Sequence, residues 1–179
     1  MATKTVSINR APVLTLWAAV VAQRLGFDED EALSLGRAVA GLNAQTKGRR
    51  LGIFKPHEEK PTKAREKARG EEFWIEICGR PVPAKNTDEG IRAVRGAQKI
   101  EPDGVRRYLE GKFGDDFGQV RSAMQRLARS FQPKELAERC FELYERFRPA
   151  IPSGVKGWGA KGELDLRVIE GLIKGRDGQ

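Results

Sequence analysis

The stretch AAVVAQRLGFDEDEALSLGR, from Ala18 to Arg37, predicts two helices joined by a tight turn. Ala22 is small enough for a close helix crossing, and Gly26, four residues later, can adopt the positive φ that a tight turn requires. Apolar residues fall where both helices would bury one face: Val21, Leu25, Phe27, Ala32 and Leu35. We therefore expect the rest of the chain to be organised around this helical pair.

Both predicted helices begin with residues that are typical of helix N-termini. Asn9 and Pro12 fit a first helix that begins near Ala11, because Asn caps helices and Pro is tolerated in the first turn. Asp28 can cap the second helix, whose acidic first turn suits the positive end of the helix dipole. An apolar stripe continues this helix to about Gln45, and residues 1–10 are expected to be frayed.

The spacing of Ala22 and Gly26 resembles that of the helix-turn-helix superfamily of DNA-binding proteins, over residues 18–37 only. This resemblance implies a tri-helical DNA-binding fold. An ordinary αα-hairpin uses the same spacing, so both interpretations stay open. A recognition helix would place Asp28, Glu29 and Asp30 at the phosphate-lined groove, where they repel it. We do not expect this helix to read bases.

The composition is that of a basic, polar protein with a real core. Of 179 residues, 39% are hydrophobic and 32% charged, which allows one domain of ordinary size or two small ones. The net charge is +8 and the pI about 9.7. The longest apolar run, Val13–Ala22, is too short to cross a membrane, and its apolar face continues past Leu25 unlike a signal peptide. The expected location is the cytoplasm.

No residue set predicts catalysis, a metal or a cofactor. Cys78 and Cys140 lack metal-site spacing, which is typical of a reducing compartment and predicts no disulfide framework. The single histidine, His57, lies in a polar loop. Gly157, Gly159 and Gly162 spell GxGxxG, but no strand and βαβ unit accompany them. We interpret this segment as a rigid loop that packs through Trp158. A phosphate contact from Lys156 and Lys161 stays open.

Positive charge is concentrated after the first two helices. Residues 47–69 contain nine Lys or Arg and three Glu, giving +6. Residues 55–71 read as an exposed basic linker. A solvated surface is the ordinary meaning of such a run, whereas phosphate binding is the functional one. The residues predicted to contact phosphates are Lys47, Arg49, Arg50, Lys63, Arg65, Lys67 and Arg80.

One hairpin is predicted near residues 72–84. Phe73, Ile75 and Ile77 alternate with more polar residues, as in a half-buried strand. Gly79 and Arg80 fit a type II′ turn. This ribbon is either a small hairpin packed on helices or the wing of a winged helix with Arg80 at its tip.

Helical patterns return after Asn86. Their predicted starts are Thr87, Pro102, Asp115, Pro133 and Asp165. In the helix after Pro133, the inner face comprises Leu136, Cys140, Leu143, Tyr144 and Phe147, so Cys140 reads as a core residue.

The sequence thus predicts a mainly α protein with a helix-turn-helix-like pair and one small hairpin. The expected units are 1–54, a linker over 55–71, and a hairpin with a helical domain over 72–179. The expected function is binding of nucleic acid, DNA above all, through its phosphate backbone, without enzymatic activity, cofactor, metal or membrane. The alternative is a protein-interaction or scaffold module with no nucleic-acid role.

Overall fold

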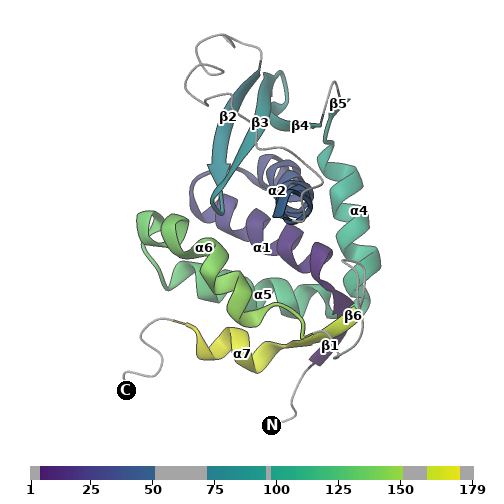
Figure 1. The fold of residues 1–179 in the computed structure, drawn as a ribbon, viewed down its shortest axis with the longest axis vertical. Coiled ribbons are helices and arrows are strands. Elements are labelled where there is room, and N and C mark those ends of the chain that lie inside the picture. Colours follow the sequence, from purple (N-terminus) through teal and green to yellow (C-terminus); the bar gives the residue numbers. More distant parts are fainter. Residues whose placement is uncertain (1–4, 51–71, 96–97, 151–160, 174–179) are drawn as a thin grey trace.

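The computed structural model describes residues 5–50, 72–95, 98–150 and 161–173, with helix α1 (Arg10–Arg24) in the middle (Figure 1). Every residue from Ala11 to Ala22 is buried. A helix can be buried on all sides only when its residues are apolar or small. The hydroxyl of Thr15, a polar residue in this stretch, donates to the Ala11 carbonyl at 2.9 Å. The short apolar run of the sequence is therefore the central element of the core.

The turn between α1 and α2 (Glu29–Arg50) confirms the prediction for Gly26, whose φ is +117°. The Phe27 and Gly26 amides donate to the Ala22 and Gln23 carbonyls, which is the Schellman arrangement of a helix end. Asp28 caps α2 as predicted: its carboxylate accepts from the Glu31 amide at 2.8 Å, and Glu31 accepts from the Asp28 amide at 3.0 Å. Such a reciprocal pair is a capping box, which fixes where α2 begins.

Helices α1 and α2 cross in close contact at Gly36. A Cβ atom at this position would lie 2.6 Å from the Thr15 carbonyl oxygen and 2.9 Å from the Ala19 nitrogen. Both are backbone atoms, so no side-chain rearrangement could make room. The smallest residue is needed at position 36, which sequence analysis did not single out.

The later helices cover α1 on the side away from the large sheet, and α4 lies beside α2 (Figure 1). The inner face predicted for α6 is confirmed, since all five of its residues are buried. The Trp17 indole of α1 donates to the Cys140 carbonyl of α6 at 2.9 Å. The bounds of these elements are α4 (Pro102–Phe113), the 3-10 turn η1 (Gly114–Asp116), α5 (Phe117–Arg129) and α6 (Pro133–Phe147).

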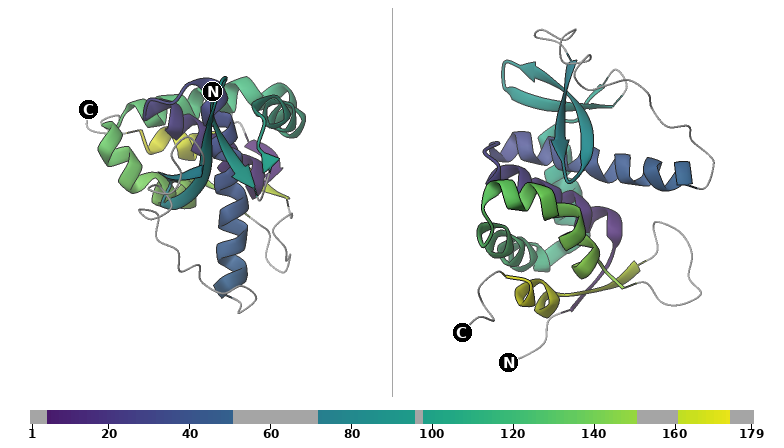
Figure 2. Two further views of the ribbon diagram at one scale, coloured as in Figure 1. Left: turned by 90° about the horizontal axis from the view of Figure 1, so that it is seen from above. Right: turned by 60° about the vertical axis from the view of Figure 1, so that its left-hand side comes forward.

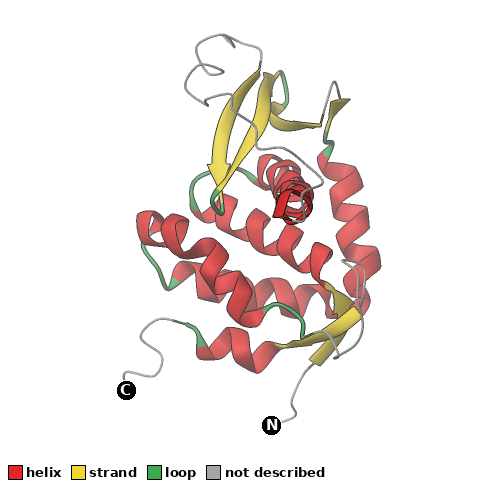
Figure 3. Ribbon diagram, in the orientation of Figure 1, coloured by secondary structure: helices red, strands yellow, loops and turns green. Residues whose placement is uncertain are grey.

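Two antiparallel sheets flank the helices, one at each end in Figure 3. The larger is a meander in which each strand pairs with the next: β2 (Glu72–Ile77), β3 (Arg80–Thr87), β4 (Gly90–Arg95) and β5 (Gln98–Lys99). In the smaller, β1 (Thr5–Asn9) pairs with β6 (Lys161–Asp165), which leads into α7 (Leu166–Gly171).

The prediction of a mainly α fold with one small hairpin is wrong: the fold is mixed α/β with two antiparallel sheets. The predicted helix start at Thr87 is a turn into β4, because Gly90 has a φ of +119° and the Thr87 hydroxyl donates to the Gly90 carbonyl. Residues 5–9, expected to be frayed, form β1, whose inward Val6 and Ile8 are buried. The helix predicted over residues 165–174 spans only Leu166–Gly171, and Gly162 lies in β6 rather than in a loop.

The β2–β3 turn also differs from the prediction. Its central residues are Cys78 and Gly79, with φ of +51° and +75°, and Arg80 already pairs with Ile77. Two successive positive φ values define a type I′ turn, not type II′. The sequence places the turn one residue too late, because cysteine seldom adopts the positive φ that Cys78 has here.

Cys78 and Cys140 form a disulfide, which corrects the prediction of none. Both are buried, and their Cα atoms lie 5.0 Å apart. The bond joins the β2–β3 turn to the middle of α6. Since 62 positions separate the two cysteines, their spacing gave no sign of the pairing.

The predicted linker, residues 55–71, lies outside the described residues. Residues from both sides of it, from Val6 to Ile169, belong to one hydrophobic core cluster. None of the helices in the described ranges is long and apolar enough to span a bilayer.

We predict that Gly36→Ala destabilises the protein by about 1–3 kcal/mol, because the new methyl group meets fixed backbone. The control is Gly111→Ala in α4, where a Cβ atom meets nothing within 4 Å. That change should stabilise the protein by roughly 0.5–1 kcal/mol through helix propensity. Urea unfolding of both variants is the measurement; equal effects would contradict the close crossing.

We predict that breaking the disulfide lowers the free energy of unfolding by about 4 kcal/mol, as expected for a closed loop of this length. Urea unfolding with and without dithiothreitol measures the loss. A Cys78→Ala, Cys140→Ala double variant serves as the control and should be insensitive to dithiothreitol. Two titratable thiols in the untreated unfolded protein would contradict the pairing.

Candidate anion-binding pocket

Side chains on one face of α2 form hydrogen bonds with the backbone of β4 in the large sheet. The Glu31 carboxylate accepts from the Ile91 amide at 3.0 Å. One turn later, the Ser34 hydroxyl accepts from the Ala93 amide and donates to the Ile100 carbonyl, both at 2.7 Å. These bonds satisfy backbone groups of β4 along the part of the strand that the short β5 leaves unpaired, and they fix the segment after β5 against α2.

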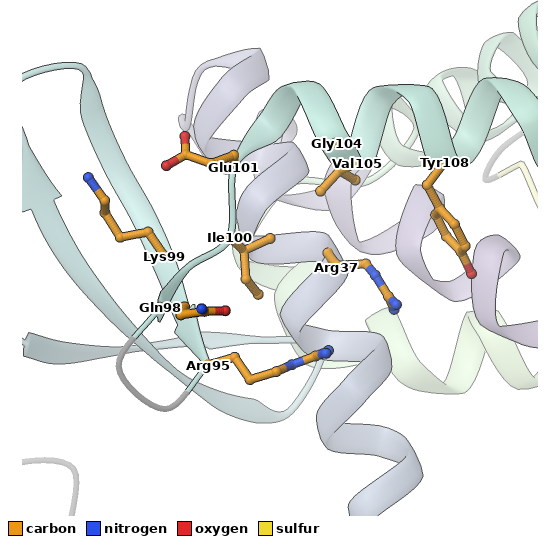
Figure 4. Close-up of a pocket in the computed structure, with 9 residues that line it drawn as sticks. All are labelled: Arg37, Arg95, Gln98, Lys99, Ile100, Glu101, Gly104, Val105 and Tyr108. Atoms are coloured by element: carbon orange, nitrogen blue, oxygen red, sulfur yellow. The ribbon is translucent and has the colours of Figure 1, made fainter.

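The same face of α2 continues into a pocket that lies between α2, α4 and the β4–β5 end of the sheet (Figure 4). Its cavity volume is about 400 Å³. Three of its side chains are basic and one is acidic. The lining residues are Arg37, Arg95, Gln98, Lys99, Ile100, Glu101, Gly104, Val105 and Tyr108.

Arg37 and Tyr108 form one wall of the pocket. The guanidinium carbon of Arg37 lies 4.8 Å from the centre of the Tyr108 ring, a cation–π contact between α2 and α4. Burial raises the pKa of the Tyr108 hydroxyl, and the positive charge of Arg37 offsets part of that rise. The hydroxyl is therefore neutral at physiological pH and able to donate a hydrogen bond.

Arg95 forms the opposite wall, with its guanidinium against Gly41 of α2. A Cβ atom at Gly41 would lie 3.0 Å from Nη2 of Arg95, so the glycine makes room for this side chain. Figure 4 shows Arg37 between Arg95 and the Tyr108 ring, whereas the Lys99 and Glu101 side chains point away. In the described part of the chain, neither Arg37 nor Arg95 has a carboxylate partner.

Such a pair of arginines can bind an anion. A guanidinium offers several donors in a plane and suits phosphate or carboxylate oxygens, and it remains charged at any physiological pH. The neutral Tyr108 hydroxyl and the Gln98 amide add further hydrogen-bonding groups. The arrangement offers binding groups, and no nucleophile paired with a base lies among its lining residues.

The residues predicted from sequence lie elsewhere. Lys47, Arg49 and Arg50 belong to the last turn of α2, which projects from the body of the molecule in Figure 2, and their side chains are outside the described set. Lys63, Arg65 and Lys67 fall outside the described residues altogether. Arg80 is half-buried, with its guanidinium carbon 5.0 Å from the centre of the Phe141 ring of α6. It packs on the body and does not line the pocket.

The acidic start of α2 is paired within the chain. Asp30 accepts from Arg106 of α4 at 2.8 Å. Glu29 lies 3.8 Å from Arg106 and 3.7 Å from Arg121 of α5. The hydrogen bond to Asp30 is the main reason why the pKa of Arg106 is raised. These contacts place α4 and α5 beside the end of α2 that a base-reading helix would expose.

A second basic pocket provides a comparison. It lies between α1 and α5, has a volume of about 310 Å³ and contains Arg24 and Arg129. Arg24 donates to the Phe131 carbonyl at 2.9 Å, just beyond the end of α5. Glutamines and small apolar residues complete this pocket: Val20, Gln23, Gln125 and Ala128. No aromatic side chain lines it.

Sequence analysis missed Arg37, Arg95 and Tyr108 because nothing in the sequence joins them. They come from three elements, each in a region where basic and acidic residues are nearly balanced. Comparison with models of protein families, with curated proteins and with solved structures finds no match to this chain.

We predict that Arg37→Met raises the pKa of Tyr108, because the variant keeps the apolar stem and removes the charge that favours the phenolate. The chain has two tyrosines. Burial raises the pKa of Tyr144 to about 12, so the first tyrosinate step belongs to Tyr108. The near-ultraviolet absorbance of tyrosinate during an alkaline titration measures it. Arg129→Met is the control, and an unchanged first step in Arg37→Met would place the two side chains apart.

Proposed function

We propose that this protein binds nucleic acid and that Arg37 and Arg95 contact its phosphates. The observation that carries the proposal is the pocket of about 400 Å³ in which these two arginines face one space without a carboxylate partner among the described residues. Unpaired positive charges that line a cleft attract an anionic ligand.

The basic residues that follow the pocket along α2 favour a polymeric ligand over a small anion. From Arg37 to Arg50 the helix rises about 20 Å, at 1.5 Å per residue. Adjacent nucleotides of one strand are about 3.4 Å apart along the axis of B-DNA, so this length spans several phosphates. Lys47, Arg49 and Arg50 are proposed to extend the contact from the pocket, followed by Lys63, Arg65 and Lys67.

The alternative, a protein-interaction module, has less support. It relied on Asp28, Glu29 and Asp30 as an acidic surface for a basic partner. Asp28 forms the capping box, and Glu29 and Asp30 already lie beside two arginines of the same chain. These contacts within the chain already occupy the carboxylates that such a partner would bind.

The test measures the salt dependence of binding. We expect that Arg37→Ala with Arg95→Ala lowers the slope of log affinity against log salt by roughly 1.4 for a single strand and 1.8 for a duplex, if each arginine contacts one phosphate. Fluorescence anisotropy with labelled oligonucleotides at several potassium chloride concentrations gives the slope.

The matched control is Arg129→Ala with Lys134→Ala, which removes the same charge from α5 and α6, on the other side of α1 (Figure 1). This control should leave the slope unchanged. An equal decrease in both double variants would show attraction by net charge alone. No binding at low salt would overturn the proposal and return the protein-interaction module to first place.

A further inference from the structure

The shape of the Arg37–Arg95 pocket offers more than phosphate contacts require. Phosphates on a duplex stand out from its surface and are reached by basic side chains on an open protein face. An unpaired nucleotide differs, because its base can leave the stack and enter a cavity. The Arg37–Arg95 pocket is an open recess of about 400 Å³ with walls from α2, α4 and the β4–β5 end of the sheet.

A stacking surface lies inside this pocket. The Tyr108 ring supports the Arg37 guanidinium from one side at 4.8 Å, and the opposite side of the guanidinium turns towards Arg95. Unpaired bases stack on aromatic rings and on arginine planes. The stack is held in place from both sides, since Arg37 belongs to α2 and Tyr108 to α4.

The remaining walls suit a nucleobase. Ile100 and Val105 are apolar, which favours the face or edge of a base over a charged phosphate. Gln98 carries both a donor and an acceptor, the combination that pairs with the edge of a base. The second basic pocket, at Arg24 and Arg129, has the arginines and amides but no ring. Of these two basic pockets, the Arg37–Arg95 pocket alone combines charge with a stacking surface.

We infer that the pocket takes one unpaired nucleotide, so that the protein prefers single-stranded nucleic acid to duplex. The base lies on the free face of the Arg37 guanidinium in the Arg37–Tyr108 stack, and the N–H edge of Arg37 and the Arg95 guanidinium contact the adjacent phosphates. This inference rests on the proposed function and adds the class of nucleic acid to it. The preference comes from stacking and not from extra charge.

The experiment compares a single strand with a duplex of the same sequence at the same salt, by fluorescence anisotropy. The wild-type protein should bind the single strand about tenfold or more tightly. Tyr108→Leu should lower single-strand affinity by about tenfold without changing the salt slope, because stacking is lost and charge is not. Tyr108→Phe, which keeps the ring, should recover most of that affinity. Arg129→Ala is the control for an arginine outside this pocket.

A second pair of variants leaves the packed side chains untouched. A Cβ atom at Gly104 meets nothing within 4 Å, so Gly104→Glu adds a carboxylate at the pocket and Gly104→Ala adds only a methyl group. Glutamate is favourable in the first turn of a helix, so α4 should stay folded. We expect Gly104→Glu, and not Gly104→Ala, to weaken single-strand binding.

The outcomes separate this inference from the proposed function. Equal affinity for single strand and duplex, or an unchanged affinity in Tyr108→Leu, would overturn the inference. If Arg37→Ala with Arg95→Ala still lowered the salt slope in that case, the proposed phosphate contacts would stand. Absence of binding to either nucleic acid would overturn both.

Discussion

The close crossing of α1 and α2 at Gly36 is the constraint on which the rest of the structure depends. Because α2 meets the backbone of α1 at Thr15 and Ala19, any side chain at position 36 would push the two helices apart. Helix α1 is buried on all sides, between α2 and the pair α5 and α6. The large sheet in turn packs on α2, so its position follows from the same contact.

Helix α2 combines a structural and a proposed binding role on one face. Glu31 and Ser34 satisfy the edge of β4, and Arg37 and Gly41 follow on the same side at helical spacing. The hydrogen bond from Ser34 to the Ile100 carbonyl therefore holds one residue of the pocket wall against α2. At the start of the helix, Glu29 and Asp30 are paired with arginines of α4 and α5, whereas Arg37 is left with an aromatic ring as its neighbour.

The large sheet is fixed at two places by different kinds of interaction. Hydrogen bonds from α2 hold β4, and the Cys78–Cys140 disulfide holds the β2–β3 turn on α6. Arg80 packs on Phe141 beside that bond. The disulfide fixes the turn at one end of the sheet, and β5 and Ile100 line the pocket at the other end.

The sequence by itself determined most of the helical segments. The Ala22–Gly26 turn, the Asp28 cap, the Pro-initiated helices α4 and α6 and the inner face of α6 follow from local spacing and capping, which depend on residues close in sequence. Tertiary structure decided the rest. The strands β1 and β6, the disulfide, the need for glycine at position 36 and the Arg37–Arg95–Tyr108 pocket all arise between residues of different elements that are far apart in the chain. No local period records such contacts, because the two partners belong to separate elements and come together only in the tertiary structure.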